Sequence, residues 1–278
     1  MNHYYEYGEG MAHCVDIFAP FSQPAITPYY GISVHTGSRN LGIKVNKYWT
    51  KVANEIRIPK SVQKEITAEV KSRPGLDKKQ IKPTIDAEIK KWREENFHPG
   101  FLSGENLRGY LTDMVIACAY ASWNHKIILD KSVEIYSKLT GGKEWKRITT
   151  RHNYIDFSGP TPIIRKGAVS AKEGEIFLLP LNMKEGVAIC EGKGNPDWLN
   201  SSSHGLGRKM SRAAAKGKIS LKDFEKEMSG IYSTSVCRET IDEAPGAYKS
   251  QDEVLENLKP TMNILMTLRP KINIKATK

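Results

Sequence analysis

The sequence predicts an α+β fold, in which helices and sheets build a single mixed α/β domain. Three observations lead to this prediction. Segments with helical spacing of apolar residues and short strand-like apolar runs both occur along the 278 residues. A hydrophobic content of 39% is enough for a substantial core. No internal repeat is visible and no linker separates independent domains.

The first strand that the sequence suggests is followed directly by a helix. Residues 31–35 are a short apolar run that ends at His35, and the polar residues 36–40 form a turn. This turn leads into a helical pattern at residues 41–49. His35 is therefore expected at the end of a strand, where functional sites are often built.

Residues 55–95 predict a charged helical hairpin. Lysines and glutamates alternate through it, and Pro74 with Gly75 breaks the pattern into two helices. Charge of this kind is typical of a solvated helical face. We interpret the hairpin as an insertion within the domain.

A long buried helix is expected at residues 105–137, where apolar residues recur at helical spacing and stop before Gly141. Short strands are predicted next, at residues 148–157, 161–165, 175–179 and 187–191. The remaining residues predict amphipathic helices that are split at residues 244–246. The chain is expected to finish on a basic, strand-like tail at residues 269–275.

A net charge of +11 favours a polyanionic partner, and nucleic acid is the first candidate. Dispersed lysines without a specific partner are the alternative. No run approaches the roughly 20 apolar residues of a membrane helix, and the first residues have no signal-peptide pattern. The four cysteines are scattered and form no CxxC pair. We therefore expect a cytoplasmic protein with no membrane partner.

Residues 201–208, Ser-Ser-Ser-His-Gly-Leu-Gly-Arg, are the main candidate for chemistry. Gly205 and Gly207 would let a large anion approach the backbone, and Arg208 offers a fork of donors for phosphate oxygens. A neutral His204 imidazole could attack a phosphorus atom and hold a nucleotide covalently. The same pattern is also consistent with a flexible Ser/Gly loop that contains a solvated histidine.

Two further histidines, His35 and His152, are expected at strand ends or turns, positions that suit imidazole ligands of a transition metal. A lone histidine in such a position is more often a satisfied core or surface residue. His13 is a third candidate, although on an alternating strand Cys14 would face away from it. The remaining histidines have weaker contexts and are expected to be structural or solvated: His3, His98 and His125.

Two other polar segments are compatible with nucleotide or RNA binding. Residues 165–168, Arg-Lys-Gly-Ala, close a predicted strand with two cations that suit phosphate, or form an ordinary charged turn. Residues 242–249 place acids, an aromatic ring and a lysine around a turn that could hold a purine. The motifs of P-loop nucleotide binding and of the common hydrolases are absent from the sequence.

Taken in order, these motifs resemble the RtcB family of RNA-splicing ligases. The resemblance covers essentially the whole chain apart from the charged hairpin, and rests on residues 35–39, 152–153, 165–168, 180–183, 204–208, 242–249 and 269–275. It implies one RtcB-like ligase domain over residues 1–278, with the helical hairpin at 55–95 inserted in it.

The resemblance implies a GTP- and Mn²⁺-dependent ligase that joins an RNA 2′,3′-cyclic phosphate or 3′-phosphate end to a 5′-hydroxyl end. Its RNA partners would be transfer-RNA halves in splicing or cleaved RNA in repair. His204 is implied to be catalytic, attacking the α-phosphate of GTP to form a covalent histidine-GMP intermediate. The implied metal ligands are His13, His35 and His152. The positions implied to contact the guanylate are Ala12, His13, Asp16, His152, Asn153, Pro180, Leu181, Asn182, Met183, Val187, His204, Gly205, Leu206, Gly207, Tyr248 and Lys275.

The resemblance weakens at the amino-terminal end. The family's Asn-His-Phe-x-Glu segment becomes Ala-His-Cys-Val-Asp at residues 12–16. Its upstream Asp-x-Gly-x-Gly-x-x-Cys segment, which supplies a carboxylate and a bridging thiolate to the metals, has no counterpart in the sequence. We expect a separate amino-terminal fragment to supply these ligands, or local residues such as Cys14 to replace them.

Two alternatives to an active ligase remain open from the sequence. One is a truncated or degenerate paralogue that binds RNA or GMP without sealing strands. The other is an unrelated basic RNA-binding scaffold in which the motifs are coincidental. The first retains the nucleotide chemistry of His204, whereas the second predicts no covalent nucleotide adduct.

Overall fold

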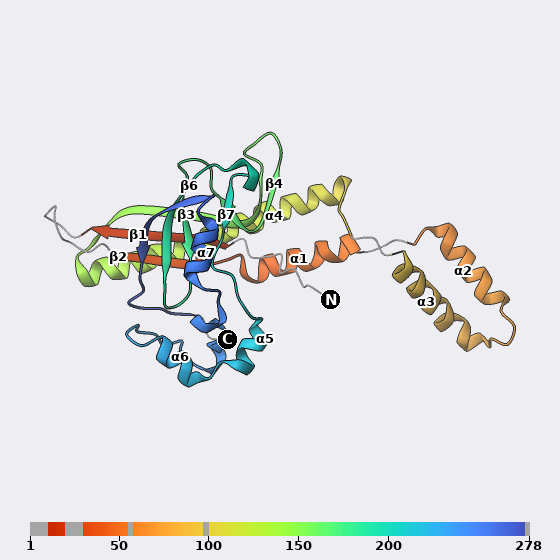
Figure 1. Cartoon of the computed structure of the whole chain (residues 1–278). Coiled ribbons are helices and arrows are strands. Elements are labelled where there is room, and N and C mark those ends of the chain that lie inside the picture. The colour runs from red at the N-terminus through yellow and green to blue at the C-terminus, as the bar shows by residue number, and fades with distance from the viewer. Residues whose placement is uncertain (1–10, 20–29, 55–57, 97–99, 276–278) are drawn as a thin grey trace. The chain divides into compact units, whose positions relative to one another are not determined.

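The structure, a computed structural model, describes residues 11–19, 30–54, 58–96 and 100–275, and of residues 11–19 it describes the backbone. The chain forms two compact units (Figure 1). The larger unit comprises Met1–Gly42 and Ile116–Lys278, and the smaller unit comprises Ile43–Val115.

Helices and strands both contribute, which confirms the α+β class. Within the described residues the strands are β1 (Met11–Ala19), β2 (Tyr30–Thr36), β3 (Lys143–Asp156), β4 (Ile163–Ser170), β5 (Ile176–Pro180), β6 (Val187–Gly192), β7 (Ser201–Ser203) and β8 (Met262–Leu268). The α-helices are α1 (Arg39–Asn54), α2 (Lys60–Ser72), α3 (Lys78–Glu95), α4 (Gly104–Thr140), α5 (Arg212–Lys218), α6 (Leu221–Glu227) and α7 (Gln251–Leu258). Short 3₁₀ helices are η1 (Pro196–Trp198), η2 (Arg238–Glu243) and η3 (Pro245–Ala247).

Two antiparallel sheets form the framework of the larger unit. The first has the strand order β2-β1-β3-β4-β7, and the second has the order β5-β6-β8. One row of backbone pairs crosses four strands of the first sheet, from Met11 through His152 and Val169 to Ser202. On the other side of β1, His13 pairs with His35. The register therefore brings the histidine-bearing segments of three distant parts of the sequence to one region of the sheet.

The two sheets are joined by β5, which is buried on both faces. Phe177 and Leu179 pack into a hydrophobic cluster with Val169 of β4. Leu178 faces the opposite way because side chains alternate along a strand, and it packs with Ile148 of β3. A strand buried on both sides reads as a continuous apolar run, which is the pattern of residues 176–179.

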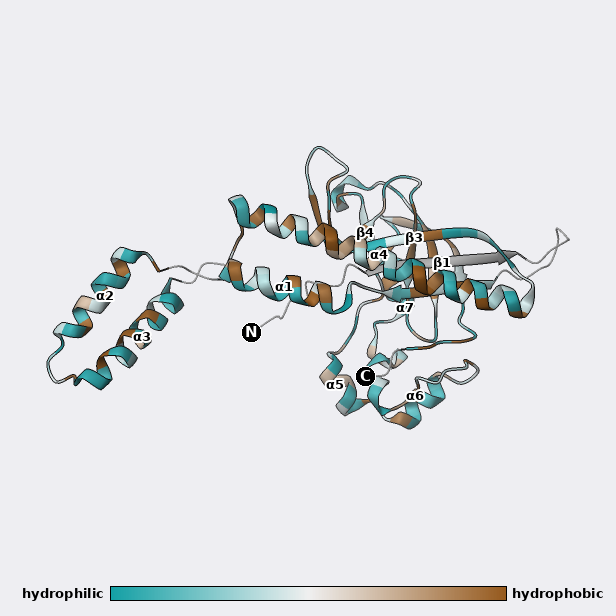
Figure 2. Ribbon diagram, turned by 180° about the vertical axis from the view of Figure 1, so that it is seen from behind, coloured by the Kyte–Doolittle hydropathy of each residue, from teal (hydrophilic) through white to brown (hydrophobic). Residues whose placement is uncertain are grey.

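Helix α4 forms where the sequence predicts it, but the prediction that it is buried is correct for only one stripe. The buried residues recur every four positions: Ala117, Ala121, His125 and Leu129. From Ile116 onward the helix lies across one face of the first sheet, behind the strands in Figure 1 and in front of them in Figure 2. Figure 2 shows hydrophobic residues on its outer side. Trp123 of this helix is 64% exposed. Apolar residues surround this helix more widely than one packing face can cover.

The smaller unit contains the predicted helical hairpin. Arg73, in the turn between α2 and α3, forms ion pairs with Glu69 of α2 and Glu88 of α3, both at 2.8 Å. Among the described side chains of the two helices only Val70 is buried, in agreement with the solvated face that the charge pattern predicts. None of the helices in the described ranges combines the length and the hydropathy that a bilayer crossing requires.

The smaller unit also includes the ends of two longer helices. Trp49 of α1 donates a hydrogen bond from Nε1 to Asp113 Oδ2 of α4 at 2.8 Å. Gly109 packs against the same indole, and a Cβ there would lie 2.6 Å from the ring. The compact unit is therefore wider than residues 55–95, and the status of that hairpin as an insertion remains a prediction.

The carboxyl-terminal part differs from the sequence prediction in two places. Helices are present, and they surround the fully buried Phe224. Of the predicted break at residues 244–246, Ala244 lies between η2 and η3, and the other two residues begin η3. The predicted strand-like tail is wrong, because the strand is β8 and the tail contributes a single bridge between Ile272 and Tyr232. Pro270 explains the end of the strand, since it has no N–H to donate to a sheet.

Candidate active site

Three histidines from three strands meet on one face of the first sheet. His35 lies near the end of β2, His152 lies on β3, and His204 directly follows β7. The ring centroids of His35 and His152 are 5.7 Å apart with the rings edge to face, and those of His152 and His204 are 4.8 Å apart. Two of these are predicted metal ligands, and the third is the predicted nucleophile.

A bulge in β4, opposite Asn153 of β3, shapes this face. Asn153 has a positive φ of 57°, and the register between β3 and β4 shifts between His152 and Tyr154. The Asn153 Oδ1 accepts a hydrogen bond from the Gly167 N–H at 2.7 Å, and Gly167 itself has a positive φ of 67°. A bulge of this kind redirects side chains locally. It lets β4 continue past Arg165, where the sequence predicts its end.

Backbone contacts on both sides hold the loop that carries His204. The His204 N–H donates to the Gly167 carbonyl at 3.3 Å. Ser203 Oγ donates to the Gly205 carbonyl at 2.7 Å, and a Cβ on Gly205 would lie 3.2 Å from the Pro180 carbonyl oxygen. The segment before the histidine is a strand paired with β4. The loop is therefore a fixed turn rather than the flexible Ser/Gly loop that the sequence alone also allows.

Burial favours neutral imidazoles in this cluster. Burial lowers the pKa of His152 to about 3, and the charge of His204 acts in the same direction. Burial also lowers the pKa of His204, and the charge of Lys166 lowers it further. The Nδ1 of His204 is buried and has no hydrogen-bond partner among the described residues. A neutral ring with an uncommitted nitrogen is the form that can attack phosphorus or bind a metal.

His35 has a different environment. Its pKa is lowered by the protein that surrounds the ring and then by the charges of His152, Lys275, His125 and His204. The residue nevertheless keeps an exposed surface, which limits how far burial can lower its pKa. The charge effects place the predicted contact residue Lys275 within electrostatic range of the cluster. Its backbone is fixed because the Lys275 N–H donates to Ser235 Oγ at 2.8 Å.

An aromatic and charged cluster follows the histidine loop. The Arg208 guanidinium lies 5.1 Å from the centre of the Tyr248 ring, and the two residues form an antiparallel bridge. Tyr248 donates its hydroxyl to Glu243 Oε2 at 2.7 Å, and burial followed by the charge of Glu243 raises the pKa of Tyr248. Arg208 also donates to the Asp242 carbonyl. The predicted contact residue Tyr248 is thus held close to the His204 loop by Arg208.

The other predicted guanylate contacts do not share one environment. Leu181, Met183 and Leu206 are buried in hydrophobic clusters, so only their backbone atoms can reach a ligand. The Asn182 Oδ1 already accepts hydrogen bonds from two backbone N–H groups that follow it in the turn. Val187 is half-buried on β6 beside the second sheet's small cluster.

Arg165 is not available to bind phosphate. This result contradicts the interpretation of residues 165–168 as a segment with two phosphate-binding cations. Its side chain is 1% exposed and forms an ion pair with Asp156. Its Nε donates to Ser201 Oγ at 3.0 Å, which ties β4 to β7. Lys166, the next residue, is exposed and is close enough to lower the pKa of His204. Of the two predicted cations, only Lys166 faces solvent.

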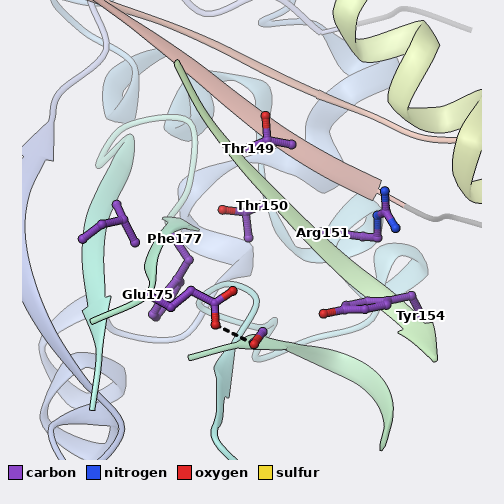
Figure 3. Close-up of a pocket in the computed structure, with 8 residues that line it drawn as sticks. Thr149, Thr150, Arg151, Tyr154, Glu175 and Phe177 are labelled. Atoms are coloured by element: carbon purple, nitrogen blue, oxygen red, sulfur yellow. Dashed lines mark hydrogen bonds between the residues drawn. The ribbon is translucent and has the colours of Figure 1, made fainter. Parts of the chain in front are cut away.

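A cavity of about 250 Å³ lies beside the histidines but none of them lines it. Figure 3 shows Thr150, Arg151 and Tyr154 of β3 around it, with Glu175 joined to Ser170 by a hydrogen bond of 2.6 Å. The Arg151 guanidinium is 5.8 Å from the Tyr154 ring centre. The lining of the cavity is mixed, since Ile176 and Phe177 contribute apolar surface beside the polar side chains.

The histidine cluster fits a transition metal in ligand type, since His35 and His152 offer neutral imidazoles and His204 has an unpartnered Nδ1. No group of three or more His, Cys, Asp or Glu side chains with metal-binding geometry occurs in the described part of the chain. The side chains of the predicted Ala12, His13 and Asp16 lie outside the described residues, although the backbone of His13 pairs with His35. His3 and His98 also lie outside the described residues.

His125 is buried and makes a specific contact that the sequence alone does not indicate. It is 1% exposed, its Nε2 accepts a hydrogen bond from the Thr36 N–H at 3.0 Å, and burial lowers its pKa to about 4. The available signal is its spacing, because it falls on the buried stripe of α4. A lone polar residue on such a stripe indicates a specific contact.

Comparison with known proteins gives one consistent result. Residues 2–276 match the family described as tRNA-splicing ligase RtcB. The chain is 28% identical over 259 residues to the RNA-splicing ligase RtcB of Escherichia coli strain K12, covering 88% of this chain and 55% of that protein. RtcB1 of Escherichia coli strain ATCC 25922 gives the same identity and coverage. RtcB2 of that strain is 27% identical over 192 residues, covering 64% of this chain and 49% of that protein. The chain thus spans about half the length of these relatives.

Proposed function

The chain belongs to the RtcB family, and on this basis we propose that it is an RNA ligase that uses GTP and joins an RNA 3′-phosphate end to a 5′-hydroxyl end. The observation that carries the proposal is the fixed, half-buried His204, with an uncommitted Nδ1, beside His152. An imidazole held neutral by burial is a nucleophile at physiological pH.

In the proposed first step a nitrogen of His204 attacks the α-phosphorus of GTP. A nitrogen–phosphorus bond forms, the bond from that phosphorus to the bridging oxygen breaks, and pyrophosphate leaves. Burial lowers the pKa of His204, so the ring begins the step without the extra proton that would block its lone pair. The Gly207 backbone leaves room for the phosphates, since no atom lies within 4 Å of a Cβ built on it.

In the following steps an oxygen of the RNA 3′-phosphate attacks the phosphorus on His204 and the nitrogen–phosphorus bond breaks. The RNA then carries GMP on its 3′-phosphate. The 5′-hydroxyl of the second RNA end attacks the RNA phosphorus, GMP leaves with the electron pair, and a phosphodiester is formed. A 2′,3′-cyclic phosphate would first be opened by water to the 3′-phosphate.

The remaining site residues would bind and orient the nucleotide and the metal ion. Tyr248 would hold the guanine base, since an aromatic face stacks on a purine, and Lys166 and Lys275 would face phosphate oxygens. His35 and His152, with His13, would hold Mn²⁺, which supplies Lewis-acid stabilisation of charge on the phosphates. The net charge of +11 suits an RNA partner, transfer-RNA halves or cleaved RNA, and the proposed location is the cytoplasm.

The test is covalent labelling. The chain is incubated with GTP labelled on its α-phosphate and with Mn²⁺, then separated on a denaturing gel. The proposal predicts a labelled band that acid removes and alkali leaves, because a phosphoramidate is acid-labile. His204→Ala should abolish the band, and Ser203→Ala, which alters the neighbouring turn but keeps the imidazole, should retain it.

A second arm adds RNA with defined ends and a candidate amino-terminal fragment of a relative. Ligation should require the 3′-phosphate and the 5′-hydroxyl. A labelled band without ligation in either arm would favour the alternative of a paralogue that binds GMP but does not seal RNA. No band in any arm, under conditions in which a longer relative is labelled, would overturn the assignment of His204.

A further inference from the structure

The end of β2, which carries His35, is held by two neighbouring side chains of α4. His125 Nε2 accepts a hydrogen bond from the Thr36 N–H at 3.0 Å. Asn124 Nδ2 donates to Thr36 Oγ1 at 3.0 Å and to the Gly37 carbonyl at 3.2 Å. Three hydrogen bonds from one turn of helix therefore fix the two residues that follow His35.

These contacts reach the strand from the face opposite the three histidines. Side chains alternate along a strand, so Thr36 faces α4 while His35 faces His152. Arg151 of β3 likewise reaches α4, where its Nη2 donates to Ser122 Oγ at 3.2 Å. Asn124 and His125 are thus placed to hold the backbone of β2 without entering the ligand side of the sheet.

The histidine at position 125 is unfavourable for stability. The other buried residues of its stripe are apolar: Ala117, Ala121 and Leu129. His125 Nε2 accepts a hydrogen bond, so the neutral ring carries its proton on Nδ1, and that atom is buried without a hydrogen-bond partner among the described residues. A buried unsatisfied polar atom destabilises the fold. The contact made by Nε2 is therefore the physical reason for a histidine here.

We propose that Asn124 and His125 are positioning residues that fix the orientation of the His35 imidazole from the opposite face of the sheet. Immobilising the Thr36 N–H and the Gly37 carbonyl fixes the peptide next to His35, and with it the direction of the His35 Cα–Cβ bond. Substituting a residue that orients a metal ligand typically lowers metal affinity by about 10- to 100-fold. The proposal rests on the proposed function, in which His35 is a metal ligand.

Four variants of the full chain separate positioning from stability. His125→Leu and Asn124→Leu keep side-chain volume and remove the hydrogen bonds. His125→Gln places an amide oxygen near the position of Nε2 and can again accept from Thr36. Leu129→Ala is the matched control, because it removes buried volume one turn further along the same stripe of α4 and leaves the hydrogen bonds to Thr36 and Gly37 in place.

Two measurements are made on each variant, with the melting temperature as reference. NMR records amide exchange at Thr36 and the ring signals of His35 in histidine-labelled protein. Titration with Co²⁺ alone records metal binding through the visible absorption of the ion. In His125→Leu the exchange rate of the Thr36 amide, corrected for global stability, should rise about tenfold, because this variant removes the acceptor of that N–H. Asn124→Leu keeps this acceptor, and its effect is followed through the ring signals of His35. In both leucine variants metal binding should weaken. The affinity for Co²⁺ should fall roughly 10- to 100-fold.

His125→Gln should restore most of the Thr36 amide protection and most of the affinity for Co²⁺. Leu129→Ala should lower the melting temperature but leave the Thr36 exchange rate and the Co²⁺ affinity of the folded protein unchanged. Unchanged Thr36 exchange and His35 signals in His125→Leu would overturn the proposal, as would equal loss of Co²⁺ affinity in Leu129→Ala. If the parent chain bound no Co²⁺, the metal part of the proposed function would fail, and the NMR data alone would still decide the positioning role.

Discussion

The His152 and His204 rings lie 4.8 Å apart between centroids and are inclined by 46° to each other. One belongs to β3 and the other to the turn after β7, and β4 lies between these strands. The arrangement places the proposed nucleophile beside a proposed metal ligand, so that a phosphate held by one is within reach of the other.

Substituting His152 should therefore suppress the reaction at His204. We expect His152→Ala to reduce the amount of acid-labile GMP adduct by at least about 100-fold, since removing a residue that merely orients a metal ligand costs 10- to 100-fold. Thr149→Ala, an exposed position on the same strand, is the control and should label normally. Equal labelling of the His152→Ala and parent chains at saturating Mn²⁺ would contradict this role.

Gly167→Ala should place a methyl group in van der Waals contact with the His204 ring, in addition to its backbone cost. Gly167 has a positive φ of 67°, and a Cβ there would lie 3.6 Å from His204 Cε1. Gly174→Ala is the matched control, with a φ of 72° and no atom within 4 Å of the added Cβ. Both variants should lose roughly 1–2 kcal/mol of stability, measured by urea unfolding. Adduct formation should slow in Gly167→Ala alone, and equal rates in the two variants would remove His204 contact as the cause.

The ring and the hydroxyl of Tyr248 should make separable contributions. Tyr248→Phe removes the 2.7 Å hydrogen bond to Glu243 and should cost about 1 kcal/mol of stability while labelling stays within about twofold. Tyr248→Leu also removes the face on which a base would stack, a contribution of about 1–3 kcal/mol. The GTP concentration for half-maximal labelling should rise roughly tenfold in Tyr248→Leu. A rise of the same size in Tyr248→Phe would assign the effect to the hydroxyl.

The Arg165–Asp156 pair should make stability depend on pH in the acid range. Burial raises the pKa of Asp156, but hydrogen bonds from Ser158 and the charge and hydrogen bond of Arg165 outweigh it and lower the pKa from 3.8 to about 2. A lowered folded-state pKa stabilises above the unfolded value, so this contribution is full above about pH 4 and is lost as the pH falls through about 2. It amounts to roughly 2 kcal/mol.

Asp156→Asn should remove this acid dependence. Because it leaves the buried Arg165 charge without its partner, it should also cost about 3–5 kcal/mol near neutral pH. Chemical denaturation of the parent and of Asp156→Asn at several pH values from 2 to 7 measures both effects. Parallel stability curves for the two proteins would show that the pair does not titrate as described.

Local patterns were sufficient for much of the fold. The turn at Pro74 and Gly75 and the stop before Gly141 located the hairpin and the end of α4, because glycine and proline act through their own backbone geometry. Of the two histidines expected at strand ends or turns, His35 lies near the end of β2, whereas His152 lies inside β3, which continues to Asp156. In contrast, β7 is three serines, and its strand character exists only through pairing with β4.

The contacts that sequence could not provide are those between distant residues. The role of His125 depends on Thr36, which is 89 positions away, and periodicity cannot distinguish a buried histidine from a solvated one until the partner is known. Arg165 has the composition of a phosphate-binding residue, and only its burial against Asp156 removes it from that role. Side-chain function of this kind is decided by tertiary packing.

The three site histidines are separated by 117 and 52 positions, since they stand at 35, 152 and 204. No partly folded chain that lacks β2, β3 or β7 can present them together. Ligand affinity and folding are consequently linked in this protein: whatever binds the assembled cluster binds only the native state, and must raise the melting temperature in proportion to the logarithm of its concentration above Kd.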